Sequence, residues 1–553
     1  MDRRKFLQQS GVAVAAAALK DTISAQPAAE SETAAYGRVI NSLEPGPMTA
    51  ERHDAELKKL LETMQRTIDA GPYEPTVESL NRRTVPDWYA DAKFGIFTHY
   101  GLYSVPGYEG RGCWYGHDMY DPDALCGAEK QPRVKSNTYQ FHLENYGPLD
   151  KFGYKDFAPL FTAHSFDADE WVSFFKQAGA RFFVPVSAFT DGYAMWNSKL
   201  TDWNVVKTGP HRDYLGLLAG AARSQGLKFG VSWHAFYRPY WFRTGRRSGT
   251  DMYPPFSGTP WSLYGPATAT PEFIDDCLGR LAELVDNYHP DLVWFDNDTD
   301  GVDPLVLRRF AAFYFNRAAQ WKKQVLINDK TSRFPANSVV LDIERGHEVG
   351  LRSKIWQTDT SVSWFDWSYI HNDSFKTEGI LIHTLVDVVS KNGVLLLDVG
   401  PRADGIIPLE PRALLTGIGA WLQINGDAIY GTRPCQVLGF GEGPHNSGGG
   451  TLSDRAVQYN AHDFRFTQKG DVVYAIAMAW PTVENHFLIR SLSTKSLSGG
   501  ISRVRLLGSP SRLDWKLTEQ GLWIRRPPHP GYYSAYPFAI SVRDSVQPAP
   551  RAG

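Results

Sequence analysis

RFFVPVSAF, residues 181–189, is a short and mostly apolar run of the kind that forms a strand covered on both faces. An amphipathic segment, DADEWVSFFKQAGA (167–180), stands directly before it and begins with an aspartate suited to capping a helix. A helix followed by a fully apolar strand is typical of a parallel sheet that is covered by helices.

The same pattern recurs along the chain. A second clear helix is predicted over TPEFIDDCLGRLAELVDNY (270–288), and a charged helical region over residues 36–81. Seven more strand-like runs are KFGIFTH (93–99), KFGVSWH (228–234), DLVWFDN (291–297), QVLIND (324–329), SVVLDIE (338–344), KIWQTD (354–359) and GVLLLDV (393–399). Eight such runs favour a (β/α)8 barrel of the TIM type over residues 36–435, with an open doubly wound sheet as the alternative.

The pattern changes at about residue 436. Alternating runs such as VVYAIAMAW (472–480) and FAISVRD (538–544), separated by Gly, Pro and Ser, predict an all-β domain over residues 436–545, most simply a β-sandwich. The predicted fold is therefore α/β, a barrel followed by a C-terminal sandwich.

The first 25 residues predict an export signal. Arg3 and Arg4 precede a short apolar run, Val12 to Leu19, which is too short to span a bilayer and resembles a twin-arginine signal cut after Ala25. The alternative is an amphipathic helix of the mature chain. The signal predicts a periplasmic or secreted protein.

The composition of the chain limits the kinds of ligand and partner that it is expected to bind. The formal net charge is −2 and no basic block occurs, so nothing indicates nucleic acid or an anionic membrane surface. No CxxC spacing connects the four cysteines, which argues against a cysteine metal site. The 17 Trp and 26 Tyr suggest platforms that stack on sugars.

Two carboxylates stand out where predicted strands end. In a barrel the active site forms at the carboxyl ends of the strands, and Asp296 and Glu344 end the fourth and sixth runs. Such a pair suits glycoside hydrolysis, in which one carboxylate attacks or stabilises the anomeric carbon and another protonates the leaving oxygen. The alternative is that each is a helix cap or pairs with a neighbour such as Arg345. Motifs for a hydrolytic serine, a phosphate loop or an HExxH zinc site are absent from the sequence.

Several long motifs, in order over roughly residues 85–435, resemble the α-L-fucosidases of glycoside hydrolase family 29. They are KFGIFTHYGLYSVPGYEG (93–110), CWYGHDMY (113–120), DGYAMWNSKLTDWN (191–204), DLVWFDND (291–298), LDIERG (341–346), WQTDTSVSW (356–364), NGVLLLDVGPRADGIIP (392–408) and INGDAIYGTRP (424–434). The resemblance implies a (β/α)8-like barrel with a β-sandwich, and a retaining exo-glycosidase acting on α-L-fucosides or a related, modified deoxy-sugar glycoside.

The resemblance also implies site residues. Asp296 corresponds to the catalytic nucleophile. Many members carry the acid/base directly after the tryptophan that is here Trp356, where this chain has Gln357. A branch with ERG followed by WQTDT implies Glu344 instead. The implied substrate-binding residues are His99, Tyr100, Trp114, Phe189, Thr190, His234 and Trp356. No metal or organic cofactor is implied, the partner is an oligosaccharide or glycoconjugate, and a homo-oligomer is left open.

Three departures from the family concern the sugar. Tyr100 replaces a tryptophan, Cys113 replaces a glutamate, and Phe189-Thr190 replace a His-His pair that reads fucose hydroxyls. One hypothesis is a sugar with an apolar modification lying on Phe189.

The alternative to a modified sugar is that other side chains restore the lost contacts, so that ordinary fucosides are cleaved. The residues considered for that role are His117, Tyr193, Trp233 and His234. A function of another class is a catalytically inactive, carbohydrate-binding homologue. Retention of both Asp296 and Glu344 favours the enzyme.

Overall fold

The eight predicted strands form a closed parallel barrel. A computed structural model describes residues 48–108, 112–126, 134–253, 258–435, 438–444, 457–497, 499–532 and 534–543. The strands pair in the order β1-β10-β9-β8-β7-β6-β5-β4 and back to β1, which confirms the barrel and excludes the open sheet. Their bounds are β1 Phe94–Thr98, β4 Phe182–Ala188, β5 Lys228–Trp233, β6 Leu292–Phe295, β7 Leu326–Asp329, β8 Val340–Asp342, β9 Trp356–Ser361 and β10 Gly393–Val399.

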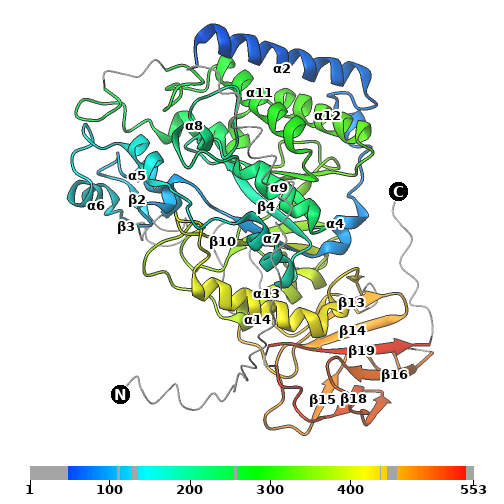
Figure 1. The fold of residues 1–553 in the computed structure, drawn as a ribbon. Coiled ribbons are helices and arrows are strands. Elements are labelled where there is room, and N and C mark those ends of the chain that lie inside the picture. The colour runs from blue at the N-terminus through cyan, green and yellow to red at the C-terminus, as the bar shows by residue number, and fades with distance from the viewer. Residues whose placement is uncertain are drawn as a thin grey trace, which may run out of the picture.

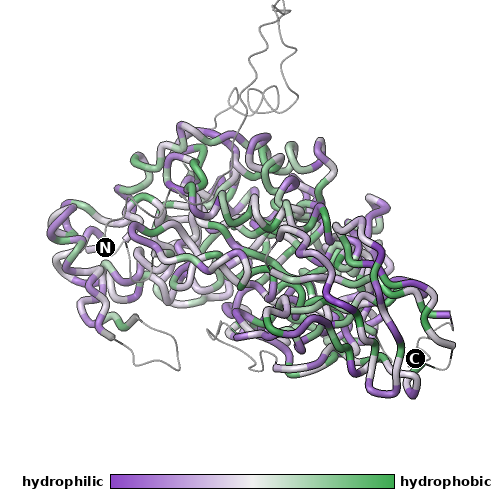
Figure 2. The backbone as a smooth tube through the Cα atoms, turned by 90° about the horizontal axis from the view of Figure 1, so that it is seen from below, coloured by the Kyte–Doolittle hydropathy of each residue, from purple (hydrophilic) through white to green (hydrophobic). Residues whose placement is uncertain are grey.

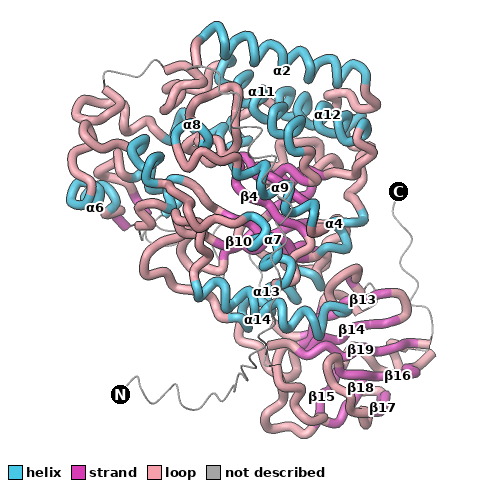
Figure 3. Tube along the Cα trace, in the orientation of Figure 1, coloured by secondary structure: helices cyan, strands magenta, loops and turns pink. Residues whose placement is uncertain are grey.

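Helices surround the barrel, as the cyan segments around the magenta strands in Figure 3 show. The main ones are α2 Ala50–Ala70, α4 Asp87–Ala92, α6 Thr138–Asn145, α7 Ala168–Gln177, α9 Tyr214–Ser224, α11 Pro271–Tyr288, α12 Pro304–Gln320, α13 Glu378–Ser390 and α14 Leu409–Asn425. The predicted caps are confirmed: the Asp167 and Thr270 side chains accept hydrogen bonds from Glu170 N and Phe273 N at the starts of α7 and α11.

Two connections in the barrel contain no helix. The segments between β7 and β8 and between β8 and β9 lie wholly within the described residues, and neither contains an α-helix. Both are short, and Pro335, Gly346 and Gly350 disfavour a regular helix there. The loops after β7 and β8 therefore carry their side chains at the mouth of the barrel without an intervening helix.

The amino end of the barrel is closed by a tyrosine. Tyr89, on the helix α4 that leads into β1, is fully buried and donates a hydrogen bond of 2.6 Å to Gln357 Oε1 of β9. Gln357 in turn donates to Asp342 Oδ2 at 2.6 Å. Because the interior is filled in this way, an approach to the barrel is left at the carboxyl ends of the strands.

The C-terminal domain consists of two antiparallel sheets (Figure 1). One has the order β11-β13-β14-β19-β16 with β12 on β13, and the other has the order β15-β18-β17. The strands are β11 Arg433–Pro434, β12 Gly441–Glu442, β13 Phe464–Lys469, β14 Val472–Ala477, β15 His486–Ile489, β16 Ile501–Leu506, β17 Trp515–Thr518, β18 Gly521–Arg525 and β19 Tyr536–Val542. The sheets share one core, in which Phe487 packs edge-on against Phe538 at 4.9 Å between ring centroids. This agrees with a sandwich.

The two domains meet through α13 and α14, drawn in yellow beside the orange strands in Figure 1. Trp421 on α14 donates from Nε1 to the Ala535 carbonyl at 2.9 Å, and Arg465 on β13 forms a buried ion pair of 2.6 Å with Asp387 on α13. In both domains hydrophobic and hydrophilic segments alternate along the chain, as elements with one covered face require (Figure 2).

Only some of the predicted domain limits fall within the described residues. Residues 1–25, predicted as the export signal, and the predicted helical residues before 48 lie outside the described residues. Strand β11 already pairs with β13 just before the predicted boundary at residue 436. No helix in the described parts of the chain combines the length and apolarity needed to cross a membrane.

Candidate active site

Asp296 and Glu344 lie at the mouth of the barrel. Asp296 directly follows β6, and Glu344 is the second residue after β8. Their side chains are 26% and 17% exposed, whereas most of the barrel's interior is fully buried. Both carboxylates are therefore accessible to a ligand at the carboxyl ends of the strands.

One lysine joins the two carboxylates. Lys330, the residue after β7, places Nζ 3.2 Å from Asp296 Oδ1 and donates a hydrogen bond of 3.0 Å to Glu344 Oε2. The same ammonium lies 3.2 Å from Asp359 Oδ2 and above the Trp294 ring, with 4.7 Å to the centroid. An oxygen of each predicted catalytic residue thus touches a single nitrogen. That proximity fits retaining glycosidases, whose two carboxyl groups are about 5–5.5 Å apart.

The environment keeps Asp296 ionised. Burial by itself would raise the Asp296 pKa, but the Lys330 ammonium and the hydrogen bond from His234 outweigh burial and hold the pKa well below its usual value. His234 Nδ1 lies 3.2 Å from Asp296 Oδ2, and Nε2 lies 2.9 Å from Ser232 Oγ. Burial lowers the His234 pKa to about 4, so a neutral imidazole faces the carboxylate.

Lys330 is held charged by its partners. Burial favours the neutral amine, but Asp359, Glu344 and Asp296 outweigh it and raise the Lys330 pKa well above its usual value. Asp359 is almost fully buried, and burial together with the nearby Asp342 raises its pKa well above the usual range. The Lys330 ammonium opposes this rise, because its contact of 3.2 Å favours the ionised form of Asp359.

An aromatic wall lines one side of this mouth. The Phe189 ring lies 5.8 Å from His99, 5.2 Å from His234, 4.9 Å from Tyr103 and 5.6 Å from Trp241 between centroids. The wall continues from Trp241 to Trp114 at 4.8 Å. The structure therefore brings His99, His234, Phe189 and Trp114 into one continuous aromatic surface.

The polar members of the wall have distinct partners. His99 Nδ1 lies 2.8 Å from Asp398 Oδ1 on the neighbouring strand β10, and burial lowers the His99 pKa to about 3. The Thr190 hydroxyl is buried and has no hydrogen-bond partner among the described residues. A neutral imidazole and an unused hydroxyl thus flank Phe189.

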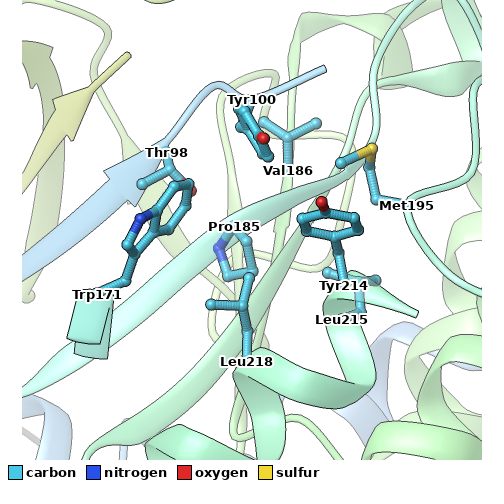
Figure 4. Close-up of a pocket in the computed structure, with 9 residues that line it drawn as sticks. All are labelled: Thr98, Tyr100, Trp171, Pro185, Val186, Met195, Tyr214, Leu215 and Leu218. Atoms are coloured by element: carbon cyan, nitrogen blue, oxygen red, sulfur yellow. The ribbon is translucent and has the colours of Figure 1, made fainter. Parts of the chain in front are cut away.

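Two predicted substrate-binding residues lie away from the mouth. Tyr100 turns behind the barrel wall and packs on Phe161 and Trp171, with centroid distances of 4.8 and 5.3 Å, and it lines a cavity of ≈ 10 Å³ (Figure 4). Trp356 is the fully buried first residue of β9, and its Nε1 donates to the Lys391 carbonyl at 3.0 Å. The structure does not bring Tyr100 or Trp356 to the carboxylates. Their positions give a packing role to both.

Of the four residues considered as replacements for the missing polar groups, only His234 contacts Phe189. His117 packs on Trp114 and Trp241 farther along the wall, and its Nδ1 lies 2.8 Å from Asp118. Tyr193 packs on Trp203, and Trp233 is fully buried against Phe236.

Sequence reasoning missed Lys330 and Trp367. Lys330 directly follows the predicted strand QVLIND, so a search extended by one residue past each strand would have found it. Trp367 lies 5.5 Å from His99 between centroids and 5.7 Å from Lys330 Nζ, but it belongs to an irregular segment after β9 that carries no strand signal. In the described part of the chain no group of three or more His, Cys, Asp or Glu side chains is arranged to hold a metal ion.

An eight-stranded barrel with two neighbouring carboxylates at its mouth is the architecture of a glycoside hydrolase. The family model "Alpha-L-fucosidase" matches residues 60–427, and the model "Alpha-L-fucosidase C-terminal domain" matches residues 458–539. The chain belongs to the α-L-fucosidase family.

Individual relatives agree with this family. The tissue α-L-fucosidase of Bos taurus is 30% identical over 471 residues, which are 82% of this chain and 86% of the relative. The α-L-fucosidase of Dictyostelium discoideum is 31% identical over 67% of this chain and 77% of its own length. The solved structure of Thermotoga maritima α-fucosidase in complex with fucose has a TM-score of 0.65 at 31% identity, covering 85% of this chain and all of that one.

Proposed function

We propose that this protein is a retaining exo-glycosidase that hydrolyses α-L-fucosides or glycosides of a closely related deoxy-sugar. The observation that carries the proposal is the contact of one ammonium, Lys330 Nζ, with Asp296 and Glu344 at the barrel mouth. Family membership supplies the sugar class, since the Thermotoga maritima relative has been captured with fucose.

Asp296 acts as the nucleophile in this proposal. Its lowered pKa keeps it ionised, and the His234 and Lys330 contacts fix its two oxygens. Its carboxylate attacks the anomeric carbon to form a glycosyl-enzyme ester while the bond to the aglycone oxygen breaks. A neutral His234 that donates from Nδ1 orients the carboxylate without neutralising it.

Glu344 acts as the acid/base. It transfers a proton to the departing aglycone oxygen, and the resulting carboxylate then removes a proton from the water that cleaves the ester. Gln357 is unsuited to this role because it is an amide whose side chain is fully buried and bonded to Tyr89 and Asp342. The loop after β8, anchored by bonds from Arg345 Nη1 to the carbonyls of Ser363 and Trp364, holds Glu344 at the mouth.

Phe189 and Thr190 set the sugar specificity in this proposal. A hydroxyl buried against Phe189 without a partner would cost on the order of 1–3 kcal/mol, which disfavours an unmodified sugar at that position. The Phe189 ring contacts both His99 and His234, which also contact each other, so an apolar substituent there would lie beside three rings. We therefore propose that the preferred glycone is a fucose-like sugar with a methyl, acyl or missing hydroxyl group facing Phe189.

The test is turnover of an aryl α-L-fucoside compared with aryl glycosides of O-methylated, acylated and further deoxygenated analogues. The expected result is a higher kcat/KM for one modified analogue. The double variant Phe189→His with Thr190→His should shift the preference back toward unmodified fucoside. Equal preference in the wild type and the double variant would contradict the proposed specificity while leaving the fucosidase assignment intact.

The inactive, carbohydrate-binding alternative predicts saturable sugar binding without turnover of any glycoside in that panel. Retention of both carboxylates and of the ammonium between them disfavours it, because a site that only binds neutral sugars does not need such an arrangement.

The proposed location is the periplasm or the exterior of the cell, on the strength of Arg3, Arg4 and the apolar run that follows them. Replacing both arginines by lysine should retain the protein in the cytoplasm if the twin-arginine route is used. Fractionation of cells with an activity assay measures this.

A further inference from the structure

A hollow of ≈ 290 Å³ lies at the opposite end of the barrel from the carboxylates, where the barrel meets the C-terminal domain. Its residues come from α4, from the amino ends of β4 and β5, and from the junction with β13. The lining residues are Trp88, Asp91, Ala92, Arg181, Lys228, Tyr430, Gly431 and Lys469.

Two aromatic rings in this hollow are fixed by hydrogen bonds, and a cationic side chain lies over each ring. Trp88 donates from Nε1 to the Gln324 carbonyl at 3.0 Å, and Tyr430 donates from its hydroxyl to the Gly179 carbonyl at 2.6 Å. The Arg181 guanidinium lies 4.2 Å from the Tyr430 ring centroid, and Lys228 Nζ lies 5.4 Å from the Trp88 ring. The rings therefore hold the stems of two cations in place.

The charge in the hollow is not balanced. Asp91, the one carboxylate in the lining, is paired with Arg433 at 2.7 Å, and Lys228 is paired with Asp291 at 3.3 Å. Arg181 and Lys469 form no ion pair with any carboxylate that the structure describes. Both side chains are exposed and line the same hollow, so their donors are available to a ligand there.

We propose that this hollow, which we call the basal site, binds an oxyanion, namely a sulfate, phosphate or carboxylate group. Arg181 supplies two parallel N–H donors for such a group, Lys469 supplies a third donor from the C-terminal domain, and Lys228 adds positive charge at the barrel side. The volume of ≈ 290 Å³ is close to the lower end of ligand sites, about 300 Å³, and is sufficient for a free anion or one acidic sugar unit.

The basal site is independent of the catalytic mouth. Its barrel residues stand before or at the start of strands, whereas Asp296 and Glu344 follow the ends of β6 and β8. An anion bound there does not occupy the space of the glycone. Because Lys469 belongs to β13 and Arg181 precedes β4, a bound anion also connects the two domains.

The experiment is calorimetric titration of the full-length protein at low ionic strength, where charges are weakly screened. The probes are inorganic sulfate, inorganic phosphate, glucose 6-sulfate and, as the uncharged control, glucose. We expect saturable binding of the anionic probes and none of glucose. Similar affinity for sulfate and glucose 6-sulfate identifies the free anion as the ligand, and tighter binding of glucose 6-sulfate identifies an acidic saccharide.

The decisive variant is Arg181→Met with Lys469→Met. Loss of two charge-assisted contacts is expected to weaken anion binding by about tenfold or more, with turnover of an aryl glycoside unchanged. The matched control, Lys58→Met with Arg503→Met, removes the same charge from exposed positions elsewhere and should bind like the wild type. Absence of saturable anion binding in the wild type, or equal binding by the two double variants, overturns the proposal.

Discussion

Two buried charge clusters in this protein are arranged in opposite ways. At the barrel mouth a single cation, Lys330, contacts three carboxylates, and two of those carboxylates are partly exposed. At the domain junction a single carboxylate, Asp387, contacts two cations, Arg465 at 2.6 Å and Lys391 at 2.8 Å, and all three side chains are at most 1% exposed.

The difference in exposure and in charge balance distinguishes a cluster that a substrate can reach from one that only stabilises the fold. The junction cluster is buried and contains no group that a ligand could reach. Its ion pairs therefore fix the packing of β13 against α13. The mouth cluster is short of positive charge and open, so its carboxylates remain available to a substrate that develops positive charge at the anomeric carbon. Burial alone would not distinguish the two clusters, whereas exposure together with charge balance does.

The largest expected effect is at the mouth. Asp296→Asn removes the oxygen that we propose attacks the sugar, with little change in size, and we expect kcat to fall on the order of 10⁴-fold or more, as for nucleophile removal in other covalent enzymes. The melting temperature should also fall, because the ionised carboxylate stabilises the fold through Lys330 and His234, so turnover is compared at a temperature at which the variant is folded. Turnover of the preferred aryl glycoside, measured beside a melting curve, checks both statements. Retained turnover would show that the mouth cluster is not the reacting site.

The second prediction concerns the junction cluster. Asp387→Asn leaves Arg465 and Lys391 buried without their carboxylate, and we expect a loss of about 3–5 kcal/mol of unfolding free energy with kcat of the folded protein retained. Denaturant unfolding and active-site titration measure the two quantities. The matched control is Glu519→Gln, which breaks an exposed pair with Lys495 and should leave stability nearly unchanged. A large fall in kcat with unchanged stability would reverse the assignment of the two clusters.

The barrel was predictable from the sequence, whereas part of the site was not. Runs such as RFFVPVSAF are apolar along their whole length because helices cover the outer face of the barrel and packed side chains fill its interior, so the strand can be predicted from the run alone. Asp296 and Glu344 followed from the rule that barrel sites form at strand ends. Lys330 was missed because it stands one residue past the predicted strand end, and its three carboxylate partners, at 296, 344 and 359, are distant in sequence.

Tyr100 shows the limit of arguing from position. It stands directly after His99, but adjacent residues of an extended segment point to opposite sides, so His99 faces the mouth and Tyr100 faces Trp171 behind the wall. The same logic applies to Trp356, which opens its strand at the amino end, far along β9 from the mouth. Sequence matching placed Tyr100 and Trp356 in two motifs that resemble the family, and only the structure shows that neither side chain faces the mouth.

The third prediction tests the mouth's charge balance. Lys330→Met removes the ammonium that helps to lower the Asp296 pKa, and opposite charges at such distances lower a carboxylate pKa by about 1–3 units. Since Asp296 must be ionised to act as the proposed nucleophile, the acidic limb of the kcat/KM profile should move to higher pH. The variant Lys330→Arg keeps the charge and should keep the limb near its wild-type position. An unmoved limb in Lys330→Met would mean that the lysine does not control this carboxylate.

The fourth prediction concerns a buried lysine that forms no ion pair among the described residues. Lys93 is fully buried, its ammonium has no hydrogen-bond partner among the described residues, and burial with repulsion from Arg433 lowers its pKa to about 7. The folded state therefore disfavours its charged form. Its cost is absent above the unfolded value near 10.5, grows as pH falls, and is complete below about 7.

Lys93→Met should accordingly stabilise the protein. The rise in melting temperature should be largest below pH 7 and should fade toward pH 10, as measured by unfolding at a series of pH values. The exposed change Lys58→Met serves as the control and should show no such trend. A rise in melting temperature that is equal at all pH values would show that the effect comes from packing rather than from charge.

The most direct test of the central assignment uses the Glu344→Gln variant and 2-fluoro-fucosyl fluoride, or the corresponding reagent for the preferred sugar. The variant keeps the proposed nucleophile, Asp296, but lacks the proposed base that activates water, so a covalent sugar adduct should accumulate. Digestion and mass spectrometry then locate the adduct. The account predicts a single modified peptide with the sugar on Asp296, whereas an adduct on another residue, or turnover without any adduct, would contradict it.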